Sequence, residues 1–188
     1  MKKELALAGI LLSATYLSAD TYIGLNLAKG LSTNTVSVGG TDVDEDNDYT
    51  NISIIVGTGE DGGFKVQGRL NIVQLDIPIY DDTHDTLVEI GVDGIKEWEV
   101  SPTLYPYVKA GLAAGSIGTD ETYYSESTAM EFSLNAGFGL SFKVNDNVDI
   151  LGGIDYVYRK YQDVDVGLLT ISTTGTSFEP YIGMRYSF

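Results

Sequence analysis

The stretch Glu131-Phe-Ser-Leu-Asn-Ala-Gly-Phe-Gly-Leu-Ser-Phe142 decides the fold of this chain. From Phe132 to Phe142, every second residue is apolar, and the residues between them are Ser, Asn or Gly. A strict period of two is the pattern of a β-strand whose two faces meet different surroundings. The stretch therefore predicts a strand with one continuous apolar face and one face of small or polar side chains.

Seven other stretches after residue 20 alternate in the same way, although less regularly. Eight strands are an even number, as a closed antiparallel barrel formed by one chain requires. The predicted fold class is all-β: an eight-stranded antiparallel up-and-down transmembrane β-barrel, preceded by a cleaved signal peptide. We expect strands at 22–30, 49–58, 64–72, 88–93, 104–115, 132–142, 148–159 and 178–188.

The expected connections alternate between short and long. Short turns at one end and long loops at the other are typical of outer-membrane barrels, and a soluble barrel has no reason to sort its connections in this way. The connections are short near 59–63 and 143–147, intermediate near 95–103, and long near 31–48, 74–86, 116–130 and 160–177.

Aromatic residues at the strand ends favour a barrel that turns its apolar face to lipid. Two belts of aromatic side chains flank the lipid-facing band of such barrels. The alternative is a soluble, secreted, lipocalin-like barrel that holds a small ligand, but such a barrel needs an apolar cup inside. The expected belts comprise Phe64, Trp98, Phe142, Tyr186 and Phe188 near the short turns, and Tyr49, Phe132, Tyr156, Tyr158 and Phe178 near the long loops.

The first 19 residues differ from the rest of the chain. A basic start at Lys2 and Lys3 precedes the apolar run 5–12, and Ser18 and Ala19 are small residues before Asp20. This order is typical of a secretory signal peptide, and the apolar run is short for a membrane-spanning helix. We expect a signal peptide at 1–19 and an outer-membrane β-barrel domain at 20–188. An N-terminal helix that stays in the fold is the alternative.

The final strand resembles the C-terminal strand of outer-membrane barrels, because Phe178-Glu-Pro-Tyr-Ile-Gly-Met-Arg-Tyr-Ser-Phe188 ends on an aromatic residue preceded by alternating apolar residues. The segments 135–149 and 155–159 are similar to the penultimate hairpin of small OmpA, OmpX and opacity-type barrels, a porin-like family, and 106–112 resembles their central strand. The resemblance implies a multi-pass protein in the cell outer membrane of a Gram-negative bacterium. It also implies that the barrel assembly machinery reads a C-terminal signal made of Ile182, Met184, Tyr186 and Phe188.

The strand periodicity places charged side chains on the inward face. Unpaired charges in a narrow lumen of low dielectric would be very costly, so we expect salt bridges among them. Two interpretations follow: a satisfied polar core that plugs the barrel, which we prefer, and a gate that opens a small pore. The expected lumen charge network, structural or gating, comprises Lys65, Arg69, Glu89, Asp93, Lys109, Glu131, Asp149, Asp155, Arg159, Glu179 and Arg185.

The long loops hold most of the remaining acidic residues, so we expect a strongly negative rim that divalent cations can bridge to lipopolysaccharide. The segment 42–48 superficially resembles a calcium loop, but it lacks Gly at the sixth position, Asn47, and Glu at the twelfth, Ser53. A solvated acidic loop is the ordinary explanation. The acidic loop residues are Asp42, Asp44, Glu45, Asp46, Asp48, Asp76, Asp81, Asp82, Asp85, Asp120, Glu121, Glu126, Asp163 and Asp165.

Composition narrows the classes of function. The net charge of −16 argues against a nucleic-acid partner, since phosphate backbones need a basic face. The chain has no cysteine, so it has no thiolate metal site. Its one histidine, His84, lies in an expected loop among acidic residues and has no His-x-Ser partner for acyl transfer. We expect no enzyme activity, no resident metal and no cofactor, with a rim enzyme acting on lipid as the minor alternative.

The sequence thus predicts an integral outer-membrane β-barrel, monomeric, with a structural or surface-interaction role. Its lumen is expected to be plugged by the charge network, and its acidic extracellular loops are expected to meet lipopolysaccharide or external partners. A narrow, porin-like channel for small solutes or ions is the alternative function. Ion conductance separates the two, because a plugged lumen conducts rarely.

Overall fold

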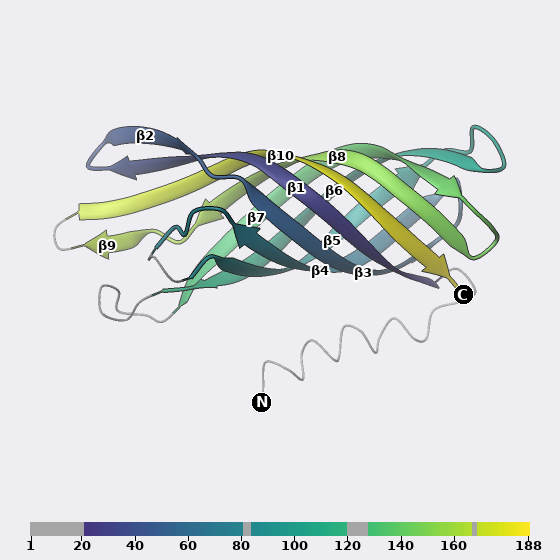
Figure 1. Cartoon of the computed structure of the whole chain (residues 1–188), viewed down its shortest axis with the longest axis horizontal. Coiled ribbons are helices and arrows are strands. Elements are labelled where there is room, and N and C mark those ends of the chain that lie inside the picture. The colour runs from purple at the N-terminus through teal and green to yellow at the C-terminus, as the bar shows by residue number, and fades with distance from the viewer. Residues whose placement is uncertain (1–20, 81–83, 120–127, 167–168) are drawn as a thin grey trace, which may run out of the picture.

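In the computed structural model, the chain forms a ring of eight long strands (Figure 1). The structure describes residues 21–80, 84–119, 128–166 and 169–188. The predicted signal peptide at 1–19 lies outside these residues. In the described part, no helix has the length and hydropathy to cross a membrane. The ring consists of β1 (Thr21–Val38), β3 (Tyr49–Gly59), β4 (Phe64–Leu75), β5 (Thr86–Glu97), β6 (Leu104–Gly118), β7 (Thr128–Lys143), β8 (Val148–Tyr161) and β10 (Leu169–Ser187).

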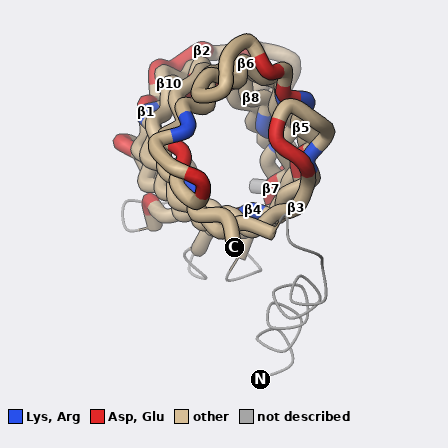
Figure 2. The backbone as a smooth tube through the Cα atoms, turned by 90° about the vertical axis from the view of Figure 1, so that its right-hand side faces the viewer, with Lys and Arg blue, Asp and Glu red and all other residues tan. Residues whose placement is uncertain are grey.

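Each strand of the ring pairs antiparallel with the next strand of the ring, and β1 pairs with β10 to close it, as the end-on view in Figure 2 shows. At this seam Leu25 lies opposite Met184 and Leu27 lies opposite Ile182. Closure leaves no strand edge in the ring, and an open edge in lipid would cost several kcal/mol for each unpaired backbone group. The predicted eight-stranded, up-and-down barrel is confirmed.

The two ends of the barrel differ as predicted. At one end, the short-turn end, tight connections join β3 to β4 and β7 to β8, and the C-terminus lies there too (Figure 1). Gly62, in the β3–β4 turn, has a φ of 69°, a conformation that residues with a Cβ rarely adopt. The other end, the long-loop end, holds the longer connections.

Much of what the sequence indicated as loop at the long-loop end is strand. β1 continues to Val38 and forms a hairpin with β2 (Thr41–Asp46), while β9 (Val164–Val166) pairs with an early part of β10. Thr33, Thr35 and Ser37 take the outward positions that apolar residues hold earlier in β1, so the apolar face that marks the rest of the strand is missing here. The loops predicted at 31–48 and 160–177 were therefore wrong in extent, because strands run well past the apolar band there, whereas the connection predicted at 74–86 agrees with the ends of β4 and β5.

The barrel is apolar outside and polar inside. On β7, Phe138 is 63% exposed, whereas the neighbouring inward residues Ser133 and Asn135 are 1% and 6% exposed. This inversion of a soluble protein is what a barrel in lipid requires. One predicted belt residue was wrong: Tyr49 is buried in the lumen, because it shares the inward face of β3 with Asn51. The other nine predicted belt residues point outward and are exposed.

A three-layered charge network in the barrel lumen

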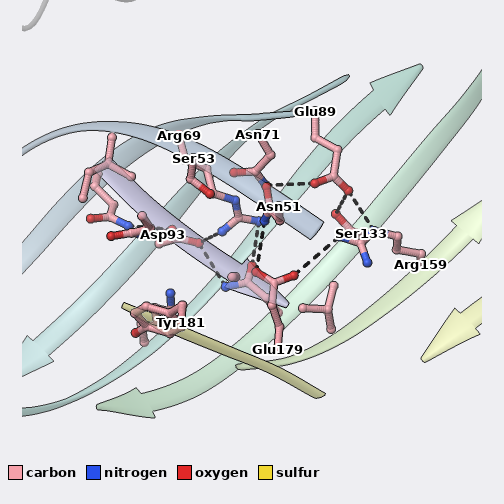
Figure 3. A pocket seen from close by; sticks show the side chains of 17 residues that line it. Asn51, Ser53, Arg69, Asn71, Glu89, Asp93, Ser133, Arg159, Glu179 and Tyr181 are labelled. Atoms are coloured by element: carbon pink, nitrogen blue, oxygen red, sulfur yellow. Dashed lines mark hydrogen bonds and ion pairs between the residues drawn. The ribbon is translucent and has the colours of Figure 1, made fainter. Parts of the chain in front are cut away.

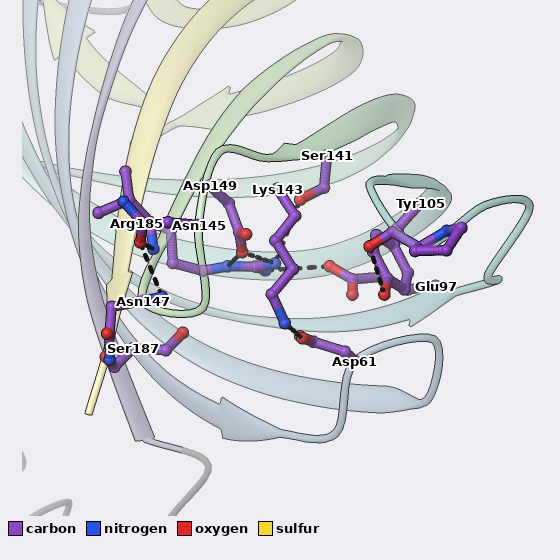
Figure 4. A network of polar contacts seen from close by, with 12 residues as sticks. Asp61, Glu97, Tyr105, Ser141, Lys143, Asn145, Asn147, Asp149, Arg185 and Ser187 are labelled. Atoms are coloured by element: carbon purple, nitrogen blue, oxygen red, sulfur yellow. Dashed lines mark hydrogen bonds and ion pairs between the residues drawn. The ribbon is translucent and has the colours of Figure 1, made fainter.

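The end of the lumen nearest the short turns holds two cations and two carboxylates, named here the short-turn layer: Lys65, Glu97, Asp149 and Arg185. Figure 4 shows Arg185 between Asp149 and Glu97. Glu97 Oε1 accepts a hydrogen bond from Arg185 Nη1 at 3.0 Å, and Glu97 Oε2 forms an ion pair with Lys65 Nζ at 3.1 Å. Arg185 Nη2 lies 2.6 Å from Asp149 Oδ2. The Arg185 guanidinium also lies 4.9 Å from the centre of the Tyr22 ring. Every charge in this layer has a close partner of opposite sign.

A surface pair extends the short-turn layer to the rim. Asp61, in the β3–β4 turn, accepts from Lys65 at 2.8 Å and from Lys143 at 2.9 Å. Partial burial acts to raise the pKa of Asp61, but the hydrogen bonds and charges of the two lysines outweigh it and lower this pKa to about 2. The turn is thus tied to the wall of the barrel on both sides.

The middle layer consists of Arg69, Asp93, Lys109 and Asp155, again two cations and two carboxylates. Arg69 pairs with Asp93 across β4 and β5, and Lys109 Nζ lies 2.7 Å from Asp155 Oδ2. Amides complete the contacts, since Gln67 donates to Asp93 at 2.9 Å. Of these contacts, the Lys109–Asp155 pair joins β6 and β8, which are not neighbours, whereas Asp93 meets Arg69 and Gln67 across the adjacent strands β4 and β5.

The long-loop layer has one cation for three carboxylates: Arg159 with Glu89, Glu131 and Glu179. Arg159, Glu89 and Glu179 can be seen in Figure 3. Arg159 Nε donates to Glu89 at 3.0 Å, while its nearest approaches to Glu131 and Glu179 are both 4.0 Å. Tyr49 supports Glu179 by donating to it at 2.8 Å. Burial disfavours the charged form of each carboxylate here. Arg159 is close enough to offset this cost with a hydrogen-bonded ion pair only at Glu89.

Glu131 is the least satisfied member of the long-loop layer. Its side chain is fully buried, and neither of its carboxyl oxygens has a hydrogen-bond partner in the described residues. The 4.0 Å approach of Arg159 is an ion pair without a hydrogen bond. By contrast, Asn71 and Ser133 both donate to Glu89, at 2.8 and 3.4 Å. The long-loop layer therefore contains a carboxyl group that is held without hydrogen bonds, by packing and by one long ion pair.

The lumen holds little free space around these layers. A cavity of about 30 Å³ lies between the middle and long-loop layers, bordered by Asn51, Asn71 and Glu179 among others. Room for a water molecule requires roughly 10–15 Å³, so this cavity holds about two. A second cavity of about 10 Å³, beside Tyr107, Tyr181 and Arg185, is close to this minimum.

All eleven charged residues predicted for the lumen lie on the inward face, and the three layers bring them together. The sequence reasoning missed Glu97, which is 1% exposed. The missed signal was its spacing, because Glu89, Asp93 and Glu97 are four residues apart and share one face of a strand. The lumen also holds buried tyrosines outside the expected charge network: Tyr22, Tyr49, Tyr107, Tyr161 and Tyr181.

The hairpin of β1 and β2 arranges part of the acidic rim in a regular row. Asp42, Asp44 and Asp46 accept hydrogen bonds from Ser37, Thr35 and Thr33, at 2.6, 2.7 and 3.3 Å. These acids lie in an extended strand, so they do not wrap around an ion as a calcium loop does. No cluster of three or more metal-ligating side chains occurs among the residues described.

Two lysines neutralise part of the acidic rim. Lys29 pairs with Asp76 at 3.0 Å and Lys160 pairs with Asp163 at 2.9 Å. The hydrogen bond from Lys160 lowers the pKa of Asp163. Several predicted loop acids lie outside the described residues: Asp81, Asp82, Asp120, Glu121 and Glu126.

The remaining predicted residues lie at the surface. His84 is exposed and its ring lies against Gly118. The four residues of the predicted assembly signal all point outward from β10 and are exposed: Ile182, Met184, Tyr186 and Phe188.

The chain matches the family model described as the outer membrane protein beta-barrel domain over residues 5–184. A search of curated proteins found no match. Among solved structures, Neisserial surface protein A is similar with a TM-score of 0.58 and 17% identity, covering 89% of this chain and 97% of that one. The outer membrane protein OprG from Pseudomonas aeruginosa is similar with a TM-score of 0.55 and 10% identity, covering 90% and 96%. At these identities the likeness to solved structures shows the fold alone.

Proposed function

The chain belongs to the outer membrane β-barrel family and is a multi-pass protein of the Gram-negative outer membrane, and from this we propose a closed barrel with a structural or surface-interaction role. In such barrels short turns face the periplasm and long loops face the exterior. The short-turn layer is accordingly periplasmic, and the long-loop layer lies beneath the outer surface. The charge network, in this proposal, is the plug that closes the lumen.

The observation that supports the plug is the set of buried ion pairs in the lumen. All five lumen cations have a carboxylate within 3.1 Å, and the pairs are stacked in three layers along the lumen. Opening a pore requires breaking buried pairs, and leaving one member of a buried pair unpaired costs about 3–5 kcal/mol. Such openings are rare at thermal energy.

Single-channel recording in planar bilayers tests this proposal. We expect the wild-type protein to show infrequent openings, and Arg69→Gln or Arg159→Gln to increase them, because each leaves a carboxylate without its nearest cation. Lys160→Gln is the matched control, since it removes a cation outside the lumen. Unchanged recordings after both lumen substitutions would count against the plug.

A narrow porin-like channel is the second candidate, and one observation favours it. The long-loop layer holds three carboxylates around a single arginine, and Glu131 lacks hydrogen bonds. Such a layer is easier to rearrange than the short-turn layer, and its negative charge would favour cations. Steady cation-selective conductance in the wild-type protein would support the channel and replace the plug.

The surface role rests on the outward hairpin at the long-loop end. Its row of Asp42, Asp44 and Asp46 presents negative charge toward lipopolysaccharide, and we propose that divalent cations bridge the two. One structural neighbour is itself named a surface protein. Replacing all three acids by Asn is expected to make retention of the barrel in lipopolysaccharide vesicles insensitive to a chelator. Retention that stays chelator-sensitive would contradict the bridge.

We propose that the protein has no catalytic role. We also propose that it is a monomer and that the barrel assembly machinery recognises its last strand. His84 is the residue that a rim enzyme would use as a base, and it is exposed, with its ring against Gly118. An unchanged lipid A profile in cells that carry His84→Ala would agree with this. Heat-modifiable gel migration monitors assembly of the folded barrel. Slower assembly of Phe188→Ala than of the wild-type protein would support the role of Phe188 in the assembly signal.

A further inference from the structure

The lipid-facing wall is not uniform, because a groove of about 610 Å³ runs across β6, β7 and β8. Bulky side chains border it, among them Trp98, Val108, Phe138 and Ile154. Its floor forms where Gly152 takes an outward position between Leu140 on β7 and Ile182 on β10. A Cβ at Gly152 would meet nothing nearer than the Tyr181 carbonyl oxygen at 3.9 Å. The missing side chain therefore leaves space on the outside.

The strand register shows that the groove rises from the periplasmic interface into the membrane. One row of paired outward residues runs from Phe64 through Lys96 and Val108 to Phe138 and Ile154. Phe64 is the first residue of β4, so this row starts at the short-turn end. Ile154 lies in the middle of β8, which spans Val148–Tyr161. Since strands of a barrel tilt by about 35–45°, the row climbs as it crosses them.

A cation without a carboxylate partner lies beside the lower end of this groove. Lys96 is half-buried and outward-facing, one strand away from Val108 and two residues from Trp98. Its Nζ donates to the carbonyl of Gly62 at 3.3 Å. Among the lysines and arginines in the described part of the chain, Lys96 alone has no carboxylate within 4.0 Å. In a chain with a net charge of −16, an unpaired cation is conspicuous.

We propose that this groove binds a phospholipid of the periplasmic leaflet that carries an anionic headgroup. The acyl chain lies in the groove above Gly152, and the headgroup phosphate pairs with Lys96. A tryptophan at the lower border suits this assignment, because indole rings favour the level of the headgroups. A basic side chain near an anionic membrane surface contributes about 1 kcal/mol, which corresponds to roughly a fivefold preference for anionic lipid.

The single tryptophan of the chain makes the site measurable, because Trp98 borders the groove. The folded barrel is reconstituted in phosphatidylcholine vesicles that contain a low fraction of brominated phosphatidylglycerol or, in parallel, brominated phosphatidylcholine. Bromine quenches Trp98 fluorescence at contact. We expect brominated phosphatidylglycerol to compete for the site about fivefold better, although the protein's net charge repels it.

Two substitutions with matched controls locate the site. Lys96→Gln is expected to abolish the preference for phosphatidylglycerol, while Lys29→Gln, which removes an outward cation at the opposite end, keeps it. Gly152→Leu is expected to fill the groove and weaken the preference. Gly68→Leu, at another outward glycine where a Cβ meets nothing nearer than 3.9 Å, keeps it. Heat-modifiable migration verifies that each variant is folded.

Three results would overturn the proposal. Equal quenching by the two brominated lipids in the wild-type protein would mean that Trp98 meets only unselected lipid. A preference that survives Lys96→Gln would remove the headgroup contact. An absence of quenching by both lipids would mean that a protein surface, such as a second copy of this chain, covers the groove.

Discussion

The short-turn layer and the long-loop layer of the lumen use the same kinds of side chain but balance them differently. In the short-turn layer, Lys65 and Arg185 share two carboxylates at distances of 2.6 to 3.1 Å. In the long-loop layer, Arg159 alone faces three carboxylates, two of them 4.0 Å away. Burial is equally deep in both. The comparison teaches that an inward position does not by itself guarantee that a charge is satisfied.

The largest expected effect is the loss of the arginine in the long-loop layer. Arg159→Met removes the cation from three buried carboxylates, so we expect the free energy of unfolding to fall by about 4 kcal/mol. Urea titration in phospholipid vesicles, followed by the fluorescence of Trp98, measures it. Arg185→Met is the comparison, and its loss should be smaller, because Lys65 still neutralises Glu97. An equal or greater loss for Arg185→Met would break the contrast between the layers.

A carboxylate of the short-turn layer should be the next most sensitive position. Glu97→Gln weakens contacts with Lys65 and Arg185, but each cation keeps another carboxylate, Asp61 or Asp149. We therefore expect a loss of about 2 kcal/mol in the free energy of unfolding, as for charge-assisted hydrogen bonds. The same urea titration measures it. A variant as stable as wild type would show that the remaining carboxylates are enough to pair with both cations of the layer.

The matching change in the long-loop layer should have the opposite sign. Glu131→Gln keeps the shape of the side chain and replaces a buried carboxyl group that has no hydrogen bonds. We expect the free energy of unfolding at neutral pH to rise by about 1 kcal/mol, because the protein no longer has to bury an ionisable group without hydrogen bonds. A loss as large as that of Glu97→Gln would show that Glu131 is well satisfied in the lumen.

The smallest effect should come from the rim of the short-turn layer. The pKa of Asp61 is lowered to about 2 in the folded protein, compared with about 4 in the unfolded chain. Asp61 therefore stabilises the folded state above pH 4, and this contribution is lost as the pH falls toward 2. Because Asp61 is partly exposed, we expect less than about 1 kcal/mol. Asp61→Asn should remove this part of the acid dependence of urea unfolding between pH 4 and pH 2. An unchanged pH profile in Asp61→Asn would contradict it.

The sequence predicted the barrel well where alternation contrasts apolar with polar residues. The expected strand at 132–142 lies within β7, and the one at 148–159 begins where β8 begins. Above the membrane this contrast disappears, since Thr33 and Thr35 face outward where apolar residues do so lower down. Backbone pairing still continues there. Because the pattern does not show it, the sequence analysis predicted a loop for β2 and the upper part of β1.

The inward position of the charges could be predicted, but not their pairing. Period two alone places Arg159 and Glu89 inside. Their contact joins β8 to β5, and which residues meet across a lumen depends on strand tilt and stagger, which no local pattern specifies. Glu97 was missed because the expected strand ended at Asp93. Tyr49 was assigned to a belt because it is aromatic and lies at a strand end, although its parity with Asn51 points inward.

Thiol labelling on intact cells tests most directly whether the network closes the lumen. The chain has no cysteine, and Ser133 and Ser141 form a matched pair, both on the inward face of β7 and 1% exposed. Ser133 contacts Glu89 of the long-loop layer, and Ser141 contacts Arg185 of the short-turn layer. With an impermeant reagent added outside, Ser133→Cys should react slowly and Ser141→Cys not at all, while Thr41→Cys on the exposed hairpin reacts at once. Rapid labelling of Ser141→Cys would show an open lumen and contradict the plug.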